Sequence, residues 1–315
     1  MVKVAILDDY QNVALSKGDW SGIPEAQVQS FQDHVADEDA LVQRLAPYEV
    51  IVAMRERTPF PRSLVERLPN LKLLVTTGAR NASFDMDALR ERGITVCGTR
   101  GSGTSTAELT WGLIIGLMRH IAEEDRNVRE GRWQTTLGPS LAGLTLGCLG
   151  LGNLGSQVAR AGKAFQMDVI AWSQNLTQER CQQVGARLVT KDELFAQADV
   201  VTIHLVLSER TRGIVGEREL GMMKPAAYLV NTSRGPIVDE DALIRAVQQG
   251  RIAGAGIDVY GVEPLPADHP YRTLKNTLLT PHIGYVTTDG YGFMYGDAVE
   301  DIKAFLNGAP VRTVP

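Results

Sequence analysis

Short apolar runs alternate with amphipathic segments through the first third of the chain. The length of each run is typical of a buried strand. Acids or proline at the start of the intervening segments predict helices, because these residues favour a first helical turn. Since parallel strands need long, usually helical connections, the alternation predicts an α/β layer structure over residues 1–98. The predicted strands are Val2 to Leu7, Val50 to Met54, Leu71 to Val75 and Ile94 to Val96, and the predicted helices are Asp37 to Leu45, Pro61 to Leu68 and Asp85 to Arg92.

A glycine-rich break at residues 98–103 precedes a second stretch with the same alternation. Ser105-Thr106-Ala107-Glu108 has the form of a capping box, which predicts the start of a helix that is apolar through Ile121. This helix or a second one continues through the charged residues 122–130, and its apolar length favours burial against a sheet or a second subunit. Six strands are predicted here, Leu144 to Leu149, Asp168 to Trp172, Val200 to His204, Ala227 to Asn231, Ile252 to Val259 and Thr277 to Thr280, with helices at Asp239 to Gln249 and Asp297 to Asn307.

A glycine motif follows the first of these strands. Gly150, Gly152 and Gly155 have the spacing G-x-G-x-x-G, and Ser156 to Gln166 reads as a helix with Val158, Ala161 and Phe165 on one face. A strand, such a turn and a helix together form a dinucleotide site. There the first glycine makes a tight turn, the second lets the backbone approach a pyrophosphate, and the third lets helix and strand pack closely.

Length and composition are those of an ordinary two-domain globular protein, with 315 residues, 44% apolar and 22% charged. The formal charge of −5 argues against nonspecific nucleic-acid binding, which needs a basic face. Cys97, Cys148 and Cys181 stand far apart, so neither a disulfide framework nor a metal site is expected. The apolar segments are too short for a signal peptide or a membrane span, and we expect a cytoplasmic protein with no membrane partner.

Polar residues that follow predicted strands are the candidates for chemistry, because ligands of open α/β sheets bind beyond the carboxyl ends of the strands. An arginine there suits a substrate carboxylate or ketone, since its planar cation donates two hydrogen bonds. A histidine suits proton transfer near neutral pH, and a carboxylate beside it fixes its tautomer. Such a set matches the needs of hydride transfer to a 2-keto acid. The residues are His204, the segment Asn231-Thr232-Ser233-Arg234-Gly235, Asp258, Glu263 and His282.

Four segments together make the chain resemble the D-isomer-specific 2-hydroxyacid dehydrogenase family over nearly its full length. They are Gly-Leu-Gly-Asn-Leu-Gly, Asn-Thr-Ser-Arg-Gly-Pro-Ile-Val-Asp-Glu, Gly-Ile-Asp-Val-Tyr and Thr-Pro-His-Ile-Gly. The resemblance implies that Arg234 binds the substrate's carboxylate and carbonyl, that His282 is the acid/base and that Glu263 orients it. It also implies two doubly wound parallel-sheet domains. A Rossmann-type dinucleotide domain would cover 99–286, and a smaller flavodoxin-like substrate domain would cover 1–98 with 287–315.

The family places a loop of the first domain on the substrate carboxylate, here around Gly78 and Ala79. This loop departs from the family's glycine-rich pattern, and Arg80 in it is a candidate for an added substrate contact, with Arg55 a weaker one of the same kind. Tyr285, close to His282, would narrow the pocket or reach the substrate.

The cofactor expected is NAD, with NADP not excluded. NAD sites usually carry an acid about 20 residues beyond the glycines, whereas this chain has the neutral Ser173-Gln174-Asn175 there, and Arg180 comes seven residues later. The residues expected to bind the cofactor are Gly150, Gly152, Asn153, Leu154, Gly155, Ser173, His204, Thr232 and Asp258.

These features predict an oxidoreductase that transfers a hydride between a nicotinamide cofactor and a small D-2-hydroxy acid or 2-keto acid. The alternative is a dinucleotide-sensing, corepressor-like binding protein with little turnover. Formate oxidation is disfavoured, because that branch of the family pairs its histidine with glutamine and position 263 is Glu. A homodimer is expected, and the identity of the acid is left open.

Overall fold

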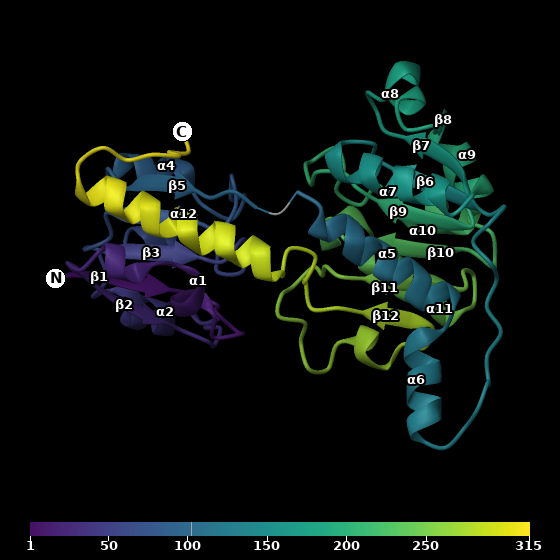
Figure 1. Ribbon diagram of the computed structural model, residues 1–315, viewed down its shortest axis with the longest axis horizontal. Coiled ribbons are helices and arrows are strands. Elements are labelled where there is room, and N and C mark those ends of the chain that lie inside the picture. The colour runs from purple at the N-terminus through teal and green to yellow at the C-terminus, as the bar shows by residue number, and fades with distance from the viewer. Residues whose placement is uncertain (102) are drawn as a thin grey trace. The chain divides into compact units, whose positions relative to one another are not determined.

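The computed structural model describes residues 1–101 and 103–315, and the chain divides into two compact units (Figure 1). Unit 1 comprises residues 1–102 and 286–315, and unit 2 comprises residues 103–285. The sequence predicts the divisions after residues 98 and 286. In the part of the chain that is described, no helix is long and apolar enough to cross a membrane.

Unit 1 is built on a parallel sheet with the strand order β2-β1-β3-β4-β5. This is the flavodoxin-like order, so the predicted class of this unit is confirmed. β2 is absent from the sequence-based prediction, because its alternating polar residues at the sheet edge leave no apolar run to recognise. The strands are β1 (Val2–Ile6), β2 (Ala26–Ser30), β3 (Val50–Ala53), β4 (Leu73–Thr76) and β5 (Thr95–Gly98).

The helices of unit 1 begin where side-chain caps are available. Asp37 and Asp85 accept hydrogen bonds from the backbone N–H groups of Ala40 and Ala88, as expected of acids at these positions. The helices are α1 (Ala14–Lys17), α2 (Glu38–Leu45), α3 (Arg62–Val65), α4 (Met86–Glu91) and α12 (Thr288–Leu306), with the short 3-10 helix η1 (Trp20–Gly22).

The last helix, α12, begins nine residues before the predicted start at Asp297. Its first turns contain Gly290, Gly292 and Gly296, whose low helix propensity argues for a loop. The segment is nevertheless helical because it packs into the core. The side chain of Tyr295 is fully buried, and a Cβ on Gly18 would lie 3.1 Å from the carbonyl oxygen of Tyr295. The prediction of a helix limited to the final residues was therefore wrong.

Unit 2 is built on a parallel sheet with the order β12-β11-β10-β9-β6-β7-β8, the Rossmann-type order with one added strand. Its order reverses between β6 and β9, which is the switch point where such sheets bind ligands. The two-residue β8 was not predicted, since a strand so short leaves no periodic signal. The strands are β6 (Thr145–Leu149), β7 (Asp168–Trp172), β8 (Arg187–Leu188), β9 (Val200–Ile203), β10 (Tyr228–Asn231), β11 (Gly254–Ile257) and β12 (Thr277–Leu279).

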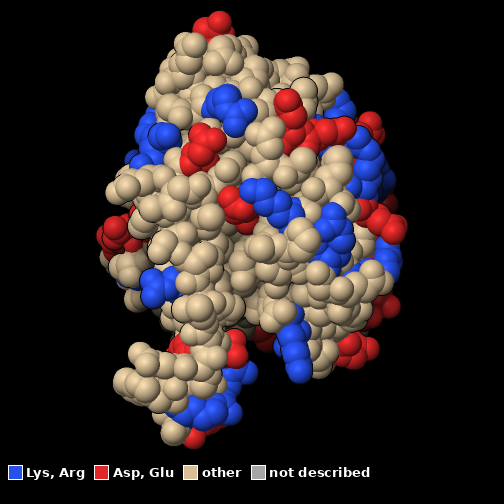
Figure 2. Space-filling model, turned by 90° about the vertical axis from the view of Figure 1, so that its right-hand side faces the viewer, with Lys and Arg blue, Asp and Glu red and all other residues tan. Residues whose placement is uncertain are grey.

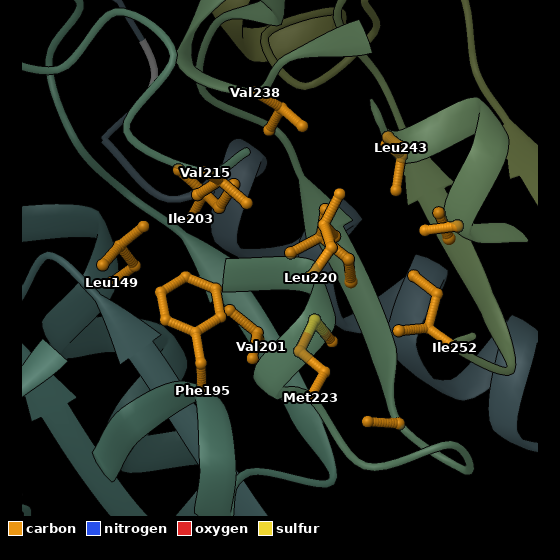
Figure 3. Packing of buried hydrophobic residues seen from close by; sticks show 14 of the residues in the cluster. Leu149, Phe195, Val201, Ile203, Val215, Leu220, Met223, Val238, Leu243 and Ile252 are labelled. Carbon is orange, nitrogen blue, oxygen red and sulfur yellow. The ribbon is translucent and has the colours of Figure 1, made fainter. Parts of the chain in front are cut away.

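Helices cover both faces of this sheet. One core cluster packs the sheet against α9, α10 and α11, and includes Leu149, Phe195 and Ile203 (Figure 3). The other packs the opposite face against α5 and α7. Because both faces are covered, the strand ends are where unit 2 presents polar groups to a ligand. The helices are α5 (Ser105–Met118), α6 (Ile121–Arg129), α7 (Asn153–Ala164), α8 (Gln178–Gln182), α9 (Lys191–Gln197), α10 (Glu217–Met222) and α11 (Glu240–Gln248), with η2 (Gly235–Ile237) and η3 (Pro270–Thr273).

Two details of the predicted helices in unit 2 were wrong. The N-cap of α5 is Thr104, whose side chain makes no capping hydrogen bond, so Ser105 to Glu108 form no capping box. The apolar face predicted for α7 is wrong at Phe165, which is exposed. Gly155, Ala159 and Gly162 are buried instead, so a different side of the helix packs against the sheet. His120, at φ +52°, separates α5 from α6, so the charged segment forms a second helix.

Candidate active site

The three glycines of the loop between β6 and α7 meet different surroundings. Gly150 has φ +100°, and a Cβ on it would lie 2.6 Å from the carbonyl oxygen of His204. A Cβ on Gly155 would overlap the carbonyl oxygen of Gly150. Around Gly152, the N-cap of α7, the described residues other than its two chain neighbours place no atom within 4 Å of the Cβ position. The first and third glycines are thus required by packing, whereas the second leaves open space at the helix N-terminus.

That open space fits a dinucleotide. The backbone N–H groups at the start of α7 have no partner within the helix, and the helix dipole favours an anion such as a pyrophosphate. Asn153, which is exposed, and Leu154, which is half-buried, form the first turn. When bound, NAD would accept or donate a hydride, and this loop would hold its pyrophosphate.

The predicted cofactor residues on the neighbouring strand ends lie in tight local contacts. His204 follows β9, its Nε2 lies 3.0 Å from Oγ1 of Thr202, and burial lowers its pKa to about 4. Its ring is therefore neutral at physiological pH. Thr232 follows β10, and its Oγ1 lies 2.8 Å from Oγ1 of Thr110 on α5. Ser173 follows β7 and lines a pocket of about 310 Å³.

Arg234 stands in a turn closed by Asn231 at the end of β10. Nδ2 of Asn231 donates to the carbonyl oxygen of Arg234 at 3.0 Å, and Oδ1 accepts from the backbone N–H of Ser233 at 3.0 Å. Oγ of Ser233 donates to the carbonyl oxygen of Ile203 on the adjacent strand. The guanidinium of Arg234, half-buried, donates from Nη1 to the carbonyl oxygen of Ser233 at 2.8 Å. The backbone that carries this cation is thus firmly held.

Gly235 brings this turn against the segment that carries Glu263. A Cβ on Gly235 would overlap the backbone carbonyl of Tyr260, so only glycine permits this approach. Oε1 of Glu263 accepts a hydrogen bond from the backbone N–H of the same Tyr260 at 3.0 Å. The arginine and glutamate segments therefore meet at Tyr260.

His282 and Glu263 form a close pair after β12 and β11. Nδ1 of His282 lies 2.6 Å from Oε2 of Glu263, and their side chains are 12% and 18% exposed. Tyr285 packs edge-on to the imidazole, with ring centroids 5.5 Å apart. Because the carboxylate engages Nδ1, it fixes the orientation of the imidazole ring.

Asp258, at the end of β11, holds the turn in which His282 lies. His282 has φ +54°, a left-handed conformation that is uncommon for a residue with a side chain. Oδ1 of Asp258 accepts from Oγ1 of Thr280 at 2.6 Å and from the backbone N–H of Ile283 at 2.8 Å, and Oδ2 accepts from Gly284 N–H at 3.0 Å. Burial raises the pKa of Asp258 despite these donors. Sequence reasoning did not reveal this anchoring role, because it depends on contacts 22 to 26 residues away.

The candidate substrate residues of the first domain lie after β3 and β4 in unit 1. Arg55, at φ +52°, donates from its backbone N–H to Oγ1 of Thr77 at 2.9 Å and from Nη1 to the carbonyl oxygen of Thr77 at 3.3 Å. Gly78 has φ +156°, and a Cβ on it would overlap the Arg55 guanidinium. Ala79 and Arg80 are exposed. Arg55 therefore stabilises this loop through its hydrogen bonds to Thr77, whereas Arg80 is the exposed cation of the loop.

Comparison with known proteins places unit 2 in a defined family. Residues 111–284 match the model of the D-isomer specific 2-hydroxyacid dehydrogenase, NAD binding domain. A glyoxylate reductase of Aeropyrum pernix is 37% identical over 281 residues, covering 83% of this chain and 84% of the relative. A D-3-phosphoglycerate dehydrogenase of Archaeoglobus fulgidus is 36% identical over 277 residues, covering 87% of this chain, and the match spans only 52% of that longer relative.

A solved structure shares the fold of the whole chain. The phosphoglycerate oxidoreductase of Vibrio cholerae O395 has a TM-score of 0.94 and 38% sequence identity, with coverage of 98% of this chain and 100% of that one. The family predicted from the four sequence segments is thereby confirmed. The chain belongs to the D-isomer-specific 2-hydroxyacid dehydrogenase family, and its residues 111–284 correspond to the NAD binding domain of that family.

Proposed function

We propose that the chain catalyses hydride transfer between NAD and a small D-2-hydroxy acid or 2-keto acid. The observation that carries this proposal is the His282–Glu263 pair, with Nδ1 and Oε2 2.6 Å apart beside the turn of Arg234. An isolated histidine would serve many purposes. A histidine oriented by a carboxylate, next to an arginine and in a unit that binds NAD, suits the reduction of a 2-keto acid.

In the reduction, Arg234 binds the substrate's carboxylate and ketone oxygen and draws electron density from the carbonyl carbon. NADH, held by the glycine loop between β6 and α7, would supply the hydride to that carbon. His282 donates the proton on Nε2 to the carbonyl oxygen, so that the product is the neutral hydroxyl, and the imidazole takes up a proton from water afterwards. Glu263 orients the imidazole through the contact of Oε2 with Nδ1. In the oxidation, the neutral His282 removes the hydroxyl proton.

Residues 78–80 of unit 1 are proposed to bind the substrate's carboxylate, and Tyr285 to line the substrate pocket. The exposed guanidinium of Arg80 and the left-handed Gly78 support this role of the loop. The substrate class proposed is that of small 2-keto acids, of the kind named for the glyoxylate reductases among its relatives. Unit 2 is proposed as the dinucleotide domain and unit 1 as the substrate domain.

We also propose a homodimer formed through α6 and the segment after it, in a cytoplasmic protein. Trp133 and Leu137 are 75% and 96% exposed, and Ile121 and Val128 on α6 are 51% and 52% exposed. α6 forms the lobe at the bottom of Figure 2. Large apolar side chains exposed on α6 and in the segment after it favour a partner. Sedimentation of the wild-type chain and of Trp133→Asp tests this, and a wild-type monomer would contradict it. The three buried, reduced cysteine thiols support a reducing compartment.

A steady-state screen of 2-keto acids with NADH tests the catalytic proposal. We expect turnover of at least one small 2-keto acid, lost by a factor of about 10² or more in Arg234→Ala and His282→Ala. Arg245→Ala, which removes an exposed arginine on α11, is the matched control and should keep wild-type turnover. Tight NADH binding without turnover of any keto acid would instead favour the dinucleotide-sensing binding protein.

A further inference from the structure

A pocket of about 310 Å³ lies in unit 2 at the carboxyl ends of β7 and β9. Trp172 and residues 173–175 line it from β7, and residues of the segment 205–214 line it from β9. In the sheet, β6 lies between these two strands and carries the glycine loop. The pocket therefore flanks the pyrophosphate site, where a dinucleotide domain holds the adenosine ribose.

The charge of this pocket is unusual for a site that selects NAD. None of its ten lining residues is an acid, and the one charged residue among them is Arg210. An aspartate or glutamate here would accept hydrogen bonds from the 2′-hydroxyl of NAD and repel a 2′-phosphate. Ser173 and Gln174 instead offer a hydroxyl and an amide, which can donate to phosphate oxygens as well as bind a hydroxyl.

Arg210 is placed to bind an anion. Within residues 1–101 and 103–315 its guanidinium has no hydrogen-bond or ion-pair partner, although the protein carries a net negative charge. Its loop is ordered by Thr211, whose Oγ1 accepts from the backbone N–H of Ser208 at 2.8 Å and donates to the carbonyl oxygen of Val206 at 2.7 Å. An exposed cation on a fixed turn, facing a pocket without acids, suits a phosphate.

Arg180, which the sequence places closest after β7, is already engaged. Its Nε donates to the carbonyl oxygen of Leu151 at 3.2 Å and its Nη2 to Oγ of Ser156 at 3.1 Å, so it braces the glycine loop. Nη1 donates to Oε1 of Gln183 at 2.9 Å. Arg210 was missed in the sequence because it follows a different strand, 38 residues after Trp172.

We propose that unit 2 also takes NADP(H), with the 2′-phosphate bound by Arg210 and hydrogen-bonded by Ser173 or Gln174. The inference rests on the dinucleotide-binding part of the proposed function and is independent of the roles of Arg234, Glu263 and His282. It makes Arg210 a specificity-determining residue, since an arginine from the loop after β9 replaces the acid that usually follows β7.

The test compares two nucleotides that differ only in the 2′-phosphate, 2′,5′-ADP and 5′-AMP, by titration calorimetry. The wild-type chain should bind 2′,5′-ADP at least as tightly as 5′-AMP. Arg210→Ala should weaken 2′,5′-ADP by about tenfold or more, because a charge-assisted hydrogen bond is lost, and leave 5′-AMP within about twofold. Arg212→Ala, an exposed arginine two residues away that does not line the pocket, is the control and should change neither.

Ser173→Asp gives the converse result. The added carboxylate should weaken 2′,5′-ADP by about tenfold or more and leave 5′-AMP bound. Wild-type binding of 2′,5′-ADP ten times weaker than 5′-AMP, or equal losses of both nucleotides in Arg210→Ala, would overturn the inference. His282→Ala should bind 2′,5′-ADP like the wild-type chain while losing turnover, so a failure of the catalytic proposal is distinguishable from a failure of this one.

Discussion

The imidazole of His282 and the carboxylate of Glu263 meet at 2.6 Å, and the other oxygen of Glu263 is held by the backbone N–H of Tyr260. Glu263→Gln keeps the size of the side chain and removes its charge. We expect kcat/KM to fall about ten- to a hundredfold, as for other residues that orient a functional histidine.

The control for this substitution is a second pair in the same unit. Nε2 of His269 lies 3.0 Å from Oε1 of Glu240 and takes no part in the proposed chemistry. Glu240→Gln should keep the wild-type kcat/KM. A wild-type kcat/KM in Glu263→Gln would contradict the orienting role.

Arg234→Lys tests whether the planar, two-point donor matters. Lysine keeps the positive charge but cannot match a carboxylate with two parallel hydrogen bonds. Since hydrogen bonds to charged groups contribute about 1.5–3 kcal/mol, kcat/KM should fall about ten- to a hundredfold. NADH binding, followed by fluorescence, should be unchanged. Wild-type kinetics in this variant would show that charge alone suffices.

The three glycines of the loop are expected to respond differently to alanine. Gly155→Ala places a Cβ against the carbonyl of Gly150, so it should lower Tm markedly, with a cost of about 2–4 kcal/mol. Gly152→Ala meets open space, so Tm should be kept while NADH binding weakens. Differential scanning calorimetry and fluorescence titration measure these two effects. Equal losses of Tm in both variants would contradict the separate roles of the glycines.

A buried carboxyl in unit 1 makes stability depend on pH. Asp301 on α12 is fully buried, and burial raises its pKa to about 7, although its Oδ1 accepts from Nε of Arg312 at 2.9 Å. The folded chain therefore holds this proton more tightly than the unfolded chain, in which Asp titrates near 3.9. This contribution to stability is complete below about pH 4 and is lost as the pH rises through 7.

Urea unfolding at several pH values between 4 and 8 measures this loss. Asp301→Asn should reduce the decline in the free energy of unfolding over that range, because the variant has no proton to release. Glu300→Gln, which changes the exposed partner of Arg312, should retain the decline. The same decline in Asp301→Asn as in the wild-type chain would assign it to other groups.

The elements that the sequence predicted have a local signal. Apolar runs located most strands, and the caps Asp37, Asp85 and Asp239 located helix starts, since a side chain three residues from its partner N–H acts within one turn. The sequence missed the short helices α1, α8, α9 and α10, and the strands β2 and β8, which have no apolar periodicity. It also missed the first half of α12, where buried packing around Tyr295 outweighs three glycines.

The same distinction applies to the site. Arg234, Glu263 and His282 follow strands and stand in recognisable segments, so the sequence alone names them as candidates. The anchoring of the His282 turn by Asp258 and the approach of Gly235 to Tyr260 depend on contacts between distant segments. Arg210 also depends on contacts between distant segments. It lines the same pocket as Ser173 because β7 and β9 lie on either side of β6 in the sheet.

The pocket beside β7 has a consequence for how this protein could change over time. Ser173, Gln174 and Arg210 belong to neither core cluster of unit 2, and Gln174 and Arg210 are exposed. Surface substitutions of this kind usually alter stability by less than about 0.5 kcal/mol. Single substitutions at these positions can thus change the preference between NAD and NADP. The glycine loop and the His282–Glu263 pair need not change with them. The same fold can therefore draw its reducing equivalents from either the NAD or the NADP pool of a cell.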